Sequence, residues 1–153
     1  MRIAVDGVTA AGKTTFADRL ATRIPDATRI TIDDFHRPPP REYYPDSFDF
    51  DAFRAAVLAA PTPLVADGVF LHHPDIVDLW DLTIFLHCDR EVARERGIAR
   101  DESWMENARD RYAARYLPGE TRYLDEVRPE RLAHLVVDNT DPAHPRLLLD
   151  STS

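Results

Sequence analysis

The stretch Gly7-Val8-Thr9-Ala10-Ala11-Gly12-Lys13-Thr14 fits the pattern G-x-x-x-x-G-K-[ST] at every fixed position. An apolar run at residues 2–5 precedes it, and Phe16, Leu20 and Ile24 follow at a spacing of four residues. This order predicts a strand, a glycine-bounded loop and an amphipathic helix. In that arrangement the backbone N–H groups of the loop form a concave nest for an anion, and the positive end of the helix faces it.

The pattern is the Walker A motif, so the loop predicts a site for the phosphate groups of a nucleotide. Lys13 would reach the β- and γ-phosphates, and the Thr14 hydroxyl would be a ligand of Mg²⁺. A ligand-free turn is the alternative, but Lys13 is the only lysine among 19 basic residues, which favours a position that requires an ammonium group. The residues expected to bind the nucleotide are Gly7, Val8, Thr9, Ala10, Ala11, Gly12, Lys13, Thr14 and Thr15.

Length and charge narrow the class of protein. A chain of 153 residues suits one domain, residues 1–153. The net charge of −8 argues against binding to nucleic acid, and no apolar run approaches the ~20 residues of a membrane span. Asp6 interrupts the first apolar stretch, which argues against a signal peptide, and Cys88 is the only cysteine, which excludes an internal disulfide. We therefore expect a cytoplasmic protein; a homo-oligomer is compatible with the sequence.

Strand and helix signals alternate along the chain. Strands are expected at residues 28–32, 63–66, 82–88, 135–137 and 146–149, and helices at 14–24, 51–60, 91–99, 105–116 and 120–127. Alternation of this kind predicts an α/β fold of three layers. Its parallel sheet of about five strands would be flanked by helices on both faces.

The loop alone does not define the reaction, because GTPases, ATPases and small-molecule kinases share it. A GTPase would need a guanine-reading N-K-x-D element, and the single lysine already belongs to the loop. A motor or transporter ATPase would normally need a longer chain. The remaining class is a compact kinase of small molecules, which would use ATP and Mg²⁺ and a small hydroxyl-bearing acceptor.

Acidic residues stand at the carboxyl ends of the expected strands, where parallel α/β sheets bind ligands. Asp33 fits the role of general base for the acceptor hydroxyl, and Asp67 fits the role of a metal ligand. The alternatives are a turn or helix cap at Asp33-Asp34 and a tight turn at Asp67-Gly68. Asp6, just before the loop, would orient loop amides, and His36 would contact the substrate.

Residues 90–115 contain seven arginines and six acidic residues. Arg96 and Arg100 lie four positions apart and share a helix face. Arginines beside a phosphate loop can stabilise the charge of a transferring phosphoryl group, so these two are candidate catalytic residues of a lid-like segment near 96–116. For the other arginines a solvated helix with ion pairs is the favoured interpretation.

Several segments together resemble the uridine kinase-like branch of the P-loop kinases, which includes phosphoribulokinase and pantothenate kinase. The likeness lies in residues 7–15, in Ile32-Asp33-Asp34-Phe35-His36, in Phe48-Asp49-Phe50-Asp51-Ala52-Phe53 and in Ala66-Asp67-Gly68-Val69-Phe70. A weaker likeness runs from Asp78-Leu79-Trp80-Asp81-Leu82 through Arg96 to Arg100-Asp101. Together these segments span most of residues 1–101.

The resemblance implies a five-stranded parallel sheet with flanking helices and ATP as phosphate donor. It implies that Asp33 is the general base, that Asp49 contacts sugar hydroxyls, and that Asp67 lies near Mg²⁺. Arg96 and Arg100 match arginines of the lid. A nucleoside is the acceptor that the resemblance favours; a sugar, a sugar phosphate or a pantothenate-like acceptor is the alternative, as is a nucleotide-binding regulator without acceptor chemistry.

The chain also departs from the family. Uridine kinases carry a base-recognising hairpin between the regions of Asp49 and Asp67, whereas here only residues 54–64 fill that interval. Ala10-Ala11 replaces the Ser-Gly often found in the loop. Either the chain is a reduced form of the family, or flexible segments are missing from it.

Overall fold

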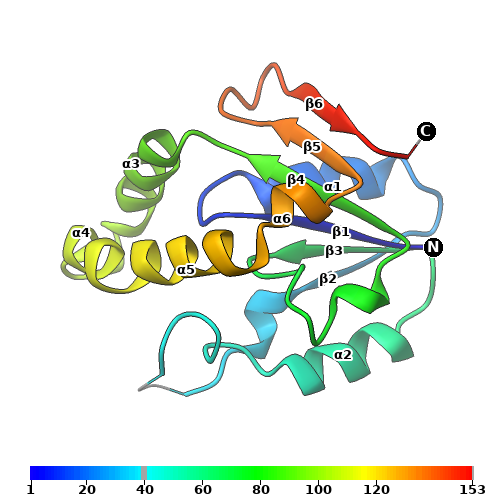
Figure 1. The fold of residues 1–153 in the computed structure, drawn as a ribbon, viewed down its shortest axis with the longest axis horizontal. Helices are drawn as coiled ribbons and strands as arrows, with labels where there is room; N and C mark the ends of the chain where they lie inside the picture. Colours follow the sequence, from blue (N-terminus) through cyan, green and yellow to red (C-terminus); the bar gives the residue numbers. More distant parts are fainter. Residues whose placement is uncertain (39–40, 153) are drawn as a thin grey trace.

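The computed structural model describes residues 1–38 and 41–152. Within them, one six-stranded sheet has the order β2-β3-β1-β4-β5-β6 (Figure 1). Its strands are β1 (Arg2–Gly7), β2 (Thr28–Thr31), β3 (Leu64–Gly68), β4 (Leu82–His87), β5 (Leu135–Asp138) and β6 (Arg146–Asp150). The first five are parallel, which confirms the predicted α/β fold.

The sixth strand lies outside the predicted parallel sheet of about five strands, because β6 runs antiparallel to β5. Only residues 139–145 connect the two strands, and a parallel return requires a crossover of a dozen or more residues. The register shifts between Val136 and Val137, so one residue of β6 bulges out of the ladder.

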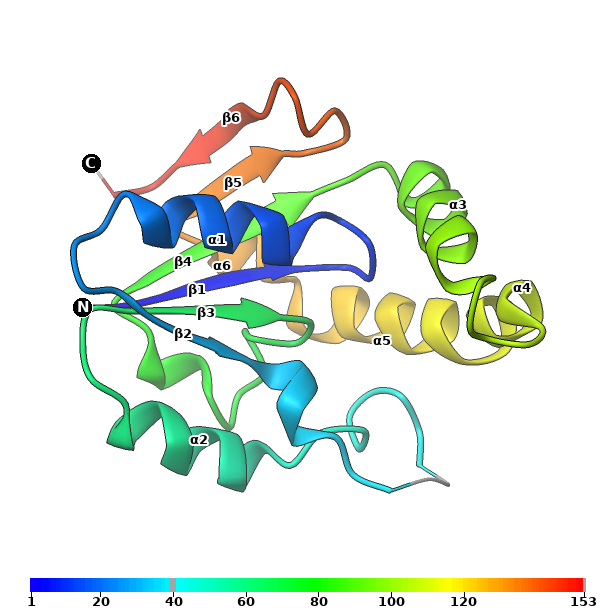
Figure 2. The same ribbon diagram turned by 180° about the vertical axis from the view of Figure 1, so that it is seen from behind.

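Helices cover both faces of the sheet (Figures 1 and 2). They are α1 (Lys13–Thr22), α2 (Phe50–Ala59), α3 (Arg90–Asp101), α4 (Ala108–Arg111), α5 (Leu117–Val127) and α6 (Pro129–Leu132). Short 3₁₀ turns occupy Ile32–Phe35 (η1) and Val77–Leu79 (η2), and a π-helical turn, Tyr112–Tyr116 (η3), joins α4 to α5. No helix among the described residues is long and apolar enough to cross a membrane.

Alternation along the buried strands divides the core between the two faces. Ile3 and Val5 of β1 pack with Ala17 of α1 on one face, whereas Ala4 packs with Phe53 of α2 on the other. Side chains of successive strand residues point to opposite faces, so a strand covered on both sides must be apolar throughout. This explains why β1 and β3 are almost continuously buried.

The connections set where a ligand can bind. The chain passes from β1 to β2 and β3 on one side of the sheet, and then to β4 and β5 on the other, so β1 stands at the point where the strand order reverses. Ligands of open α/β sheets bind at the carboxyl ends of the strands beside such a point. Helices α3, α4 and α5 project past these carboxyl ends of the strands (Figure 2). The amino end of β1 lies at the opposite end of the strands.

A small core of its own supports the projecting helices. This core consists of four residues buried against one another: Ile98, Met105, Ala108 and Tyr112. The side chain of Tyr112 packs directly against Gly97 of α3. A Cβ atom on residue 97 would lie 2.8 Å from Cζ of Tyr112. The Tyr112 hydroxyl cannot move away without losing its 2.9 Å hydrogen bond to the buried carboxylate of Asp101. Gly97 is therefore required by close packing.

We predict that Gly97→Ala lowers the free energy of unfolding by about 1–3 kcal/mol, the usual cost of overpacking a core. The direction of this change distinguishes close packing from helix propensity. At a helical position without close neighbours, alanine instead raises the free energy of unfolding relative to glycine by about 1 kcal/mol. Urea denaturation followed by circular dichroism measures the effect, with Glu91→Ala at an exposed position of α3 as the control. An increase in stability would contradict this account of Gly97.

Candidate functional site

The phosphate loop closes tightly between β1 and α1. Gly12 has a left-handed backbone (φ 90°), and a Cβ atom there would lie 2.6 Å from Nδ2 of Asn139. The same amide donates a 2.8 Å hydrogen bond to the carbonyl of Ala11, so Asn139, just after β5, holds the loop from outside. The Lys13 ammonium donates to the carbonyl of Val8 at 2.7 Å and so lies across the loop.

Two buried carboxylates accept hydrogen bonds from backbone N–H groups of the phosphate loop. Asp6 accepts a 2.7 Å hydrogen bond from the N–H of Gly7, which confirms the expectation that it orients a loop amide. Glu120 of α5 accepts one of 2.7 Å from the N–H of Thr9. Asp6 also lies 2.7 Å from His72 Nδ1 and accepts from the Tyr123 hydroxyl.

Sequence reasoning did not identify Glu120, His72 or Tyr123. Glu120 stands in a segment of mixed charge that resembles a solvated helix, and His72-His73 resembles an ordinary surface pair. The distances along the chain are 111 residues for Thr9 to Glu120 and 117 for Asp6 to Tyr123. Only the packing of α5 across the loop brings these groups together, and no local pattern encodes it.

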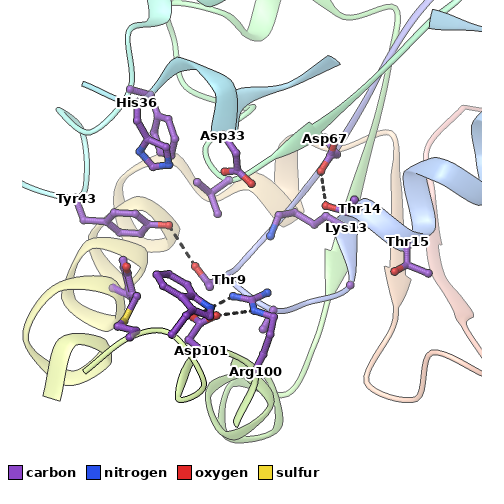
Figure 3. A pocket seen from close by; sticks show the side chains of 17 residues that line it. Thr9, Lys13, Thr14, Thr15, Asp33, His36, Tyr43, Asp67, Arg100 and Asp101 are labelled. Atoms are coloured by element: carbon purple, nitrogen blue, oxygen red, sulfur yellow. Dashed lines mark hydrogen bonds and ion pairs between the residues drawn. The ribbon is translucent and has the colours of Figure 1, made fainter. Parts of the chain in front are cut away.

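A cavity of about 420 Å³ opens above the loop (Figure 3). The predicted site residues Lys13, Asp33 and Asp67 all line it, although they lie at or after the carboxyl ends of three different strands, β1, β2 and β3. The residues lining it from the loop, η1 and β3 are Thr9, Ala10, Gly12, Lys13, Thr14, Thr15, Asp33, His36, Asp67 and Val69. Tyr43, Phe48, Arg100, Asp101, Trp104, Met105 and Tyr116 complete the lining.

Asp33 lies on η1, and its carboxylate points into the cavity on the same side as His36 (Figure 3). Thr31 caps this turn by accepting a hydrogen bond from the N–H of Asp33. No described residue donates a hydrogen bond to the Asp33 carboxylate itself. The turn therefore fixes the backbone of Asp33 and leaves its carboxylate available to a ligand.

Asp67 and Thr14 form a pair of oxygen donors beside Lys13. The Thr14 hydroxyl lies 2.9 Å from Asp67 Oδ2, and the other Asp67 oxygen accepts a 2.9 Å hydrogen bond from Arg29. No cluster of three or more His, Cys, Asp and Glu suited to a metal ion occurs at residues 1–38 and 41–152. Mg²⁺ does not need one, since it typically binds one or two protein oxygens together with substrate phosphates and water. The donor pair therefore fits Mg²⁺.

Burial and neighbouring charges act on Lys13 in opposite directions, and burial has the larger effect. Desolvation lowers the pKa of the Lys13 ammonium, and the carboxylates of Glu120 and Asp33 act in the opposite direction. Desolvation also raises the pKa of Glu120, against the hydrogen bonds it receives from Thr9. Carboxylates close to a lysine favour its charged form, and burial favours the neutral form.

Aromatic side chains wall the cavity on the side away from the loop. His36 and Phe48 are tilted against each other with ring centroids 4.5 Å apart, and the centroids of Tyr43 and Tyr116 are 4.9 Å apart. The Tyr43 hydroxyl lies 3.2 Å from the hydroxyl of Thr9, which connects this wall to the phosphate loop. The cavity thus combines a charged floor with an aromatic wall.

Arg96 and Arg100 face two different cavities. Arg100 lines the first cavity and forms a 2.8 Å ion pair with Asp101. Arg96 donates to the carbonyls of Ala10 and Thr140, at 3.5 and 2.8 Å. It lines a second cavity, of about 500 Å³, together with Gly12, Thr15, Phe16, Arg19, Leu20, Arg23, Asn139, Pro142 and Pro145.

Asp49 is a predicted substrate contact that does not line the first cavity. Its carboxylate caps α2 by accepting a 2.9 Å hydrogen bond from the N–H of Ala52, and Arg37 lies 4.0 Å away. The cap fixes the side chain at the helix end, so the structure does not bring Asp49 together with Asp33 and Lys13.

No family model matches the sequence, and no curated protein matches it. Solved structures do match. A possible uridine kinase from Bacillus stearothermophilus is 17% identical to this chain, with a TM-score of 0.66. The match covers 89% of this chain and 87% of that chain. A gluconokinase from Sinorhizobium meliloti 1021 is 21% identical, with a TM-score of 0.62 and coverages of 92% and 83%.

A shikimate kinase from Bacteroides thetaiotaomicron is also similar, at 16% identity and a TM-score of 0.57, with 92% of this chain and 86% of that chain covered. The chain therefore has the fold of the P-loop kinases, as its resemblance to the uridine kinase-like branch implies.

Proposed function

We propose that the protein transfers the γ-phosphoryl group of Mg·ATP to a hydroxyl group of a small molecule, with a nucleoside as the favoured acceptor. The observation that carries this proposal is the position of Asp33. Its carboxylate accepts no hydrogen bond from a described residue and lines a single cavity together with Lys13 and the Thr14–Asp67 donor pair. A base, a phosphate site and a metal-binding pair in one cavity are what phosphoryl transfer to a hydroxyl requires.

The two cavities suggest how the donor binds. Gly12 and Thr15 line both of them, so the phosphate loop is their common wall. A nucleotide whose phosphates occupy the loop would extend its base into the second cavity, between the apolar side of α1 and Pro142. Arg19, Arg23 and Arg96 supply positive charge around that cavity. The γ-phosphate would then point into the first cavity, toward Asp33.

In the proposed reaction the acceptor oxygen attacks the γ-phosphorus in line with the leaving ADP oxygen. The new O–P bond forms as the bond to the β,γ-bridging oxygen breaks, and the acceptor proton passes to Asp33. Lys13 stabilises the phosphate charge, and Arg100 does so from the side of α3. Thr14 and Asp67 would hold Mg²⁺, which neutralises the charge on the phosphates when bound.

The aromatic wall supports a nucleoside as acceptor, because flat rings stack on aromatic side chains. A sugar or a pantothenate-like acceptor would use the same mechanism and would differ only in its contacts with this wall. A regulator that merely binds a nucleotide would have no need of the Asp33 carboxylate in the cavity. A cytoplasmic location, where ATP is plentiful, accompanies this proposal.

The reaction is tested by ADP release from Mg·ATP in the presence of separate acceptors: uridine, cytidine, other nucleosides, pantothenate, ribulose 5-phosphate, gluconate and simple sugars. We expect one nucleoside to raise ADP release well above the rate with ATP alone. If only an aliphatic acceptor raises ADP release, the substrate is of that aliphatic class and not a nucleoside. No response to any acceptor, with nucleotide binding intact, would favour the regulatory alternative.

We predict that Lys13→Ala lowers kcat/KM by at least about 100-fold, because it removes the charge that faces the phosphates. Its affinity for Mg·ATP should fall as well, which calorimetry measures. Arg131→Ala on α6 is the control, since it removes one positive charge from an exposed position remote from both cavities. Wild-type turnover and affinity in Lys13→Ala would refute the assignment of the phosphate site.

We predict that Asp33→Ala lowers kcat by about 10²–10⁴-fold, the usual loss on removing a general base. Binding of Mg·ATP should be largely retained, because Asp33 faces the acceptor. The adjacent Asp34 is also exposed but does not line the cavity, so Asp34→Ala is the matched control and should keep its turnover. Unchanged turnover in Asp33→Ala would exclude Asp33 as the base.

A further inference from the structure

We infer that Trp104 determines acceptor specificity: its indole forms the outer wall of the first cavity and stacks on a planar ring of the bound acceptor. This inference rests on the proposed function. Trp104 lies in the turn between α3 and α4 and lines the cavity together with Arg100, Asp101 and Met105. Trp104 has no part in the proposed phosphoryl transfer or in the geometry of the phosphate loop.

The exposure of Trp104 is the first observation. Trp104 is 69% exposed, the highest value among the exposed large apolar residues that the structure describes, whereas Trp80, the other tryptophan, is 8% exposed. Trp80 also donates its indole N–H to the carbonyl of Leu71 and belongs to the core. A large aromatic side chain exposed at the mouth of a cavity gains apolar burial only when something covers it.

The support beneath Trp104 is the second observation. Its backbone N–H donates to the carbonyl of Asp101 at 3.1 Å, and the N–H of the next residue, Met105, donates to the same carbonyl at 2.8 Å. Asp101 and Met105 are buried, and Tyr112 and Arg100 bind the Asp101 carboxylate. Burial acts to raise the pKa of Asp101, but these hydrogen bonds prevail and keep it below its usual value.

This arrangement fixes the backbone that carries the indole, while most of the surface of Trp104 stays exposed. A side chain whose own turn is held by buried hydrogen bonds loses little conformational entropy when a ligand covers it. Trp104 is thus pre-organised for binding, unlike an exposed tryptophan on a freely moving loop.

The opposite side of the cavity is the third observation. Figure 3 shows His36 and Asp33 across the cavity from Arg100 and Asp101. Trp104 lines the cavity and is bonded through its backbone N–H to the carbonyl of Asp101, so it belongs to the side of Asp101. His36 is itself exposed, and its ring is supported by Phe48. The flat ring of an acceptor that enters between these walls contacts aromatic surface on both sides. The hydroxyl group of the same acceptor then faces Asp33. An aliphatic acceptor would leave the indole largely uncovered.

Tryptophan fluorescence tests the contact directly. With excitation at 295 nm, quenching by acrylamide reports the exposed Trp104, because Trp80 is buried; a neutral quencher avoids repulsion by the net charge of −8. The probes are uridine, as a ring-bearing acceptor, and gluconate, as an aliphatic one, each added with Mg²⁺ and a non-hydrolysable ATP analogue. We expect uridine to reduce the quenching constant at least twofold and gluconate to leave it unchanged. Repeating the titration with Trp80→Phe, which leaves Trp104 as the sole tryptophan, assigns the signal.

Kinetics provide the second test. Trp104→Ala should raise KM for the nucleoside by about 5- to 100-fold, the range expected for loss of one base–aromatic stack. KM for Mg·ATP should change less than twofold, and Trp104→Phe should recover most of the loss. Leu148→Ala removes an exposed apolar side chain of β6 far from the cavity and is the control.

The two hypotheses fail in different ways. If a nucleoside is phosphorylated but does not protect Trp104, and Trp104→Ala keeps its KM, the role of Trp104 is wrong and the kinase proposal stands. The same conclusion follows if the productive acceptor has no ring. If no acceptor responds in the ADP assay, the proposed function fails and the inference fails with it.

Discussion

The buried carboxylate of Asp6 is the constraint on which the arrangement of the site depends. Its side chain is fully buried at the end of β1, and an ionised carboxylate is stable there only when donors surround it. The donors are the N–H of Gly7, the hydroxyl of Tyr123 and Nδ1 of His72. These groups come from the phosphate loop, from α5 and from the segment after β3, so satisfying one charge brings three parts of the chain together.

The position of α5 follows from the same cluster. The Tyr123 hydroxyl also accepts a 3.0 Å hydrogen bond from the N–H of His72, and three residues earlier on the helix Glu120 binds the N–H of Thr9. Residues three apart lie on one face of a helix, so both groups point toward the loop. Because α5 is held there, η3 and α4 before it must extend past the strand ends, and the cavity acquires its outer wall.

Much of the fold could be predicted from the sequence. The strands and most helices carry strong periodicity, and the loop pattern with its flanking elements fixes the order of β1 and α1. The predicted parallel sheet of about five strands is confirmed by β1 to β5. Periodicity identifies β6 as a strand but not its orientation, which follows from the short connection that begins at Asn139. Residues 105–116 were expected to form one helix. The structure instead starts α4 at Ala108, after Asn107 adopts a left-handed backbone with φ 56°.

The candidate site could be predicted in part, for a related reason. Residues close to a strand end, such as Asp33 and Asp67, meet in the cavity because parallel strands end at one edge. Asp49 does not line the cavity, and its pattern, an aspartate before an amphipathic run, fits a helix cap equally well. Glu120 and Trp104 belong to the site through contacts between distant segments. Charge and hydropathy identify them only as residues of a polar helical region.

The spacing of Arg96 and Arg100 shows how one helix can serve both halves of the proposed reaction. Four residues advance about 6 Å along a helix, so the two guanidinium groups lie on neighbouring turns of one face. Arg96 binds the carbonyl of Ala10 and faces the second cavity, while Arg100 faces the first. The phosphate loop separates the two cavities. Helix α3 therefore presents positive charge on both sides of the loop, as a nucleotide that extends from one cavity into the other would require.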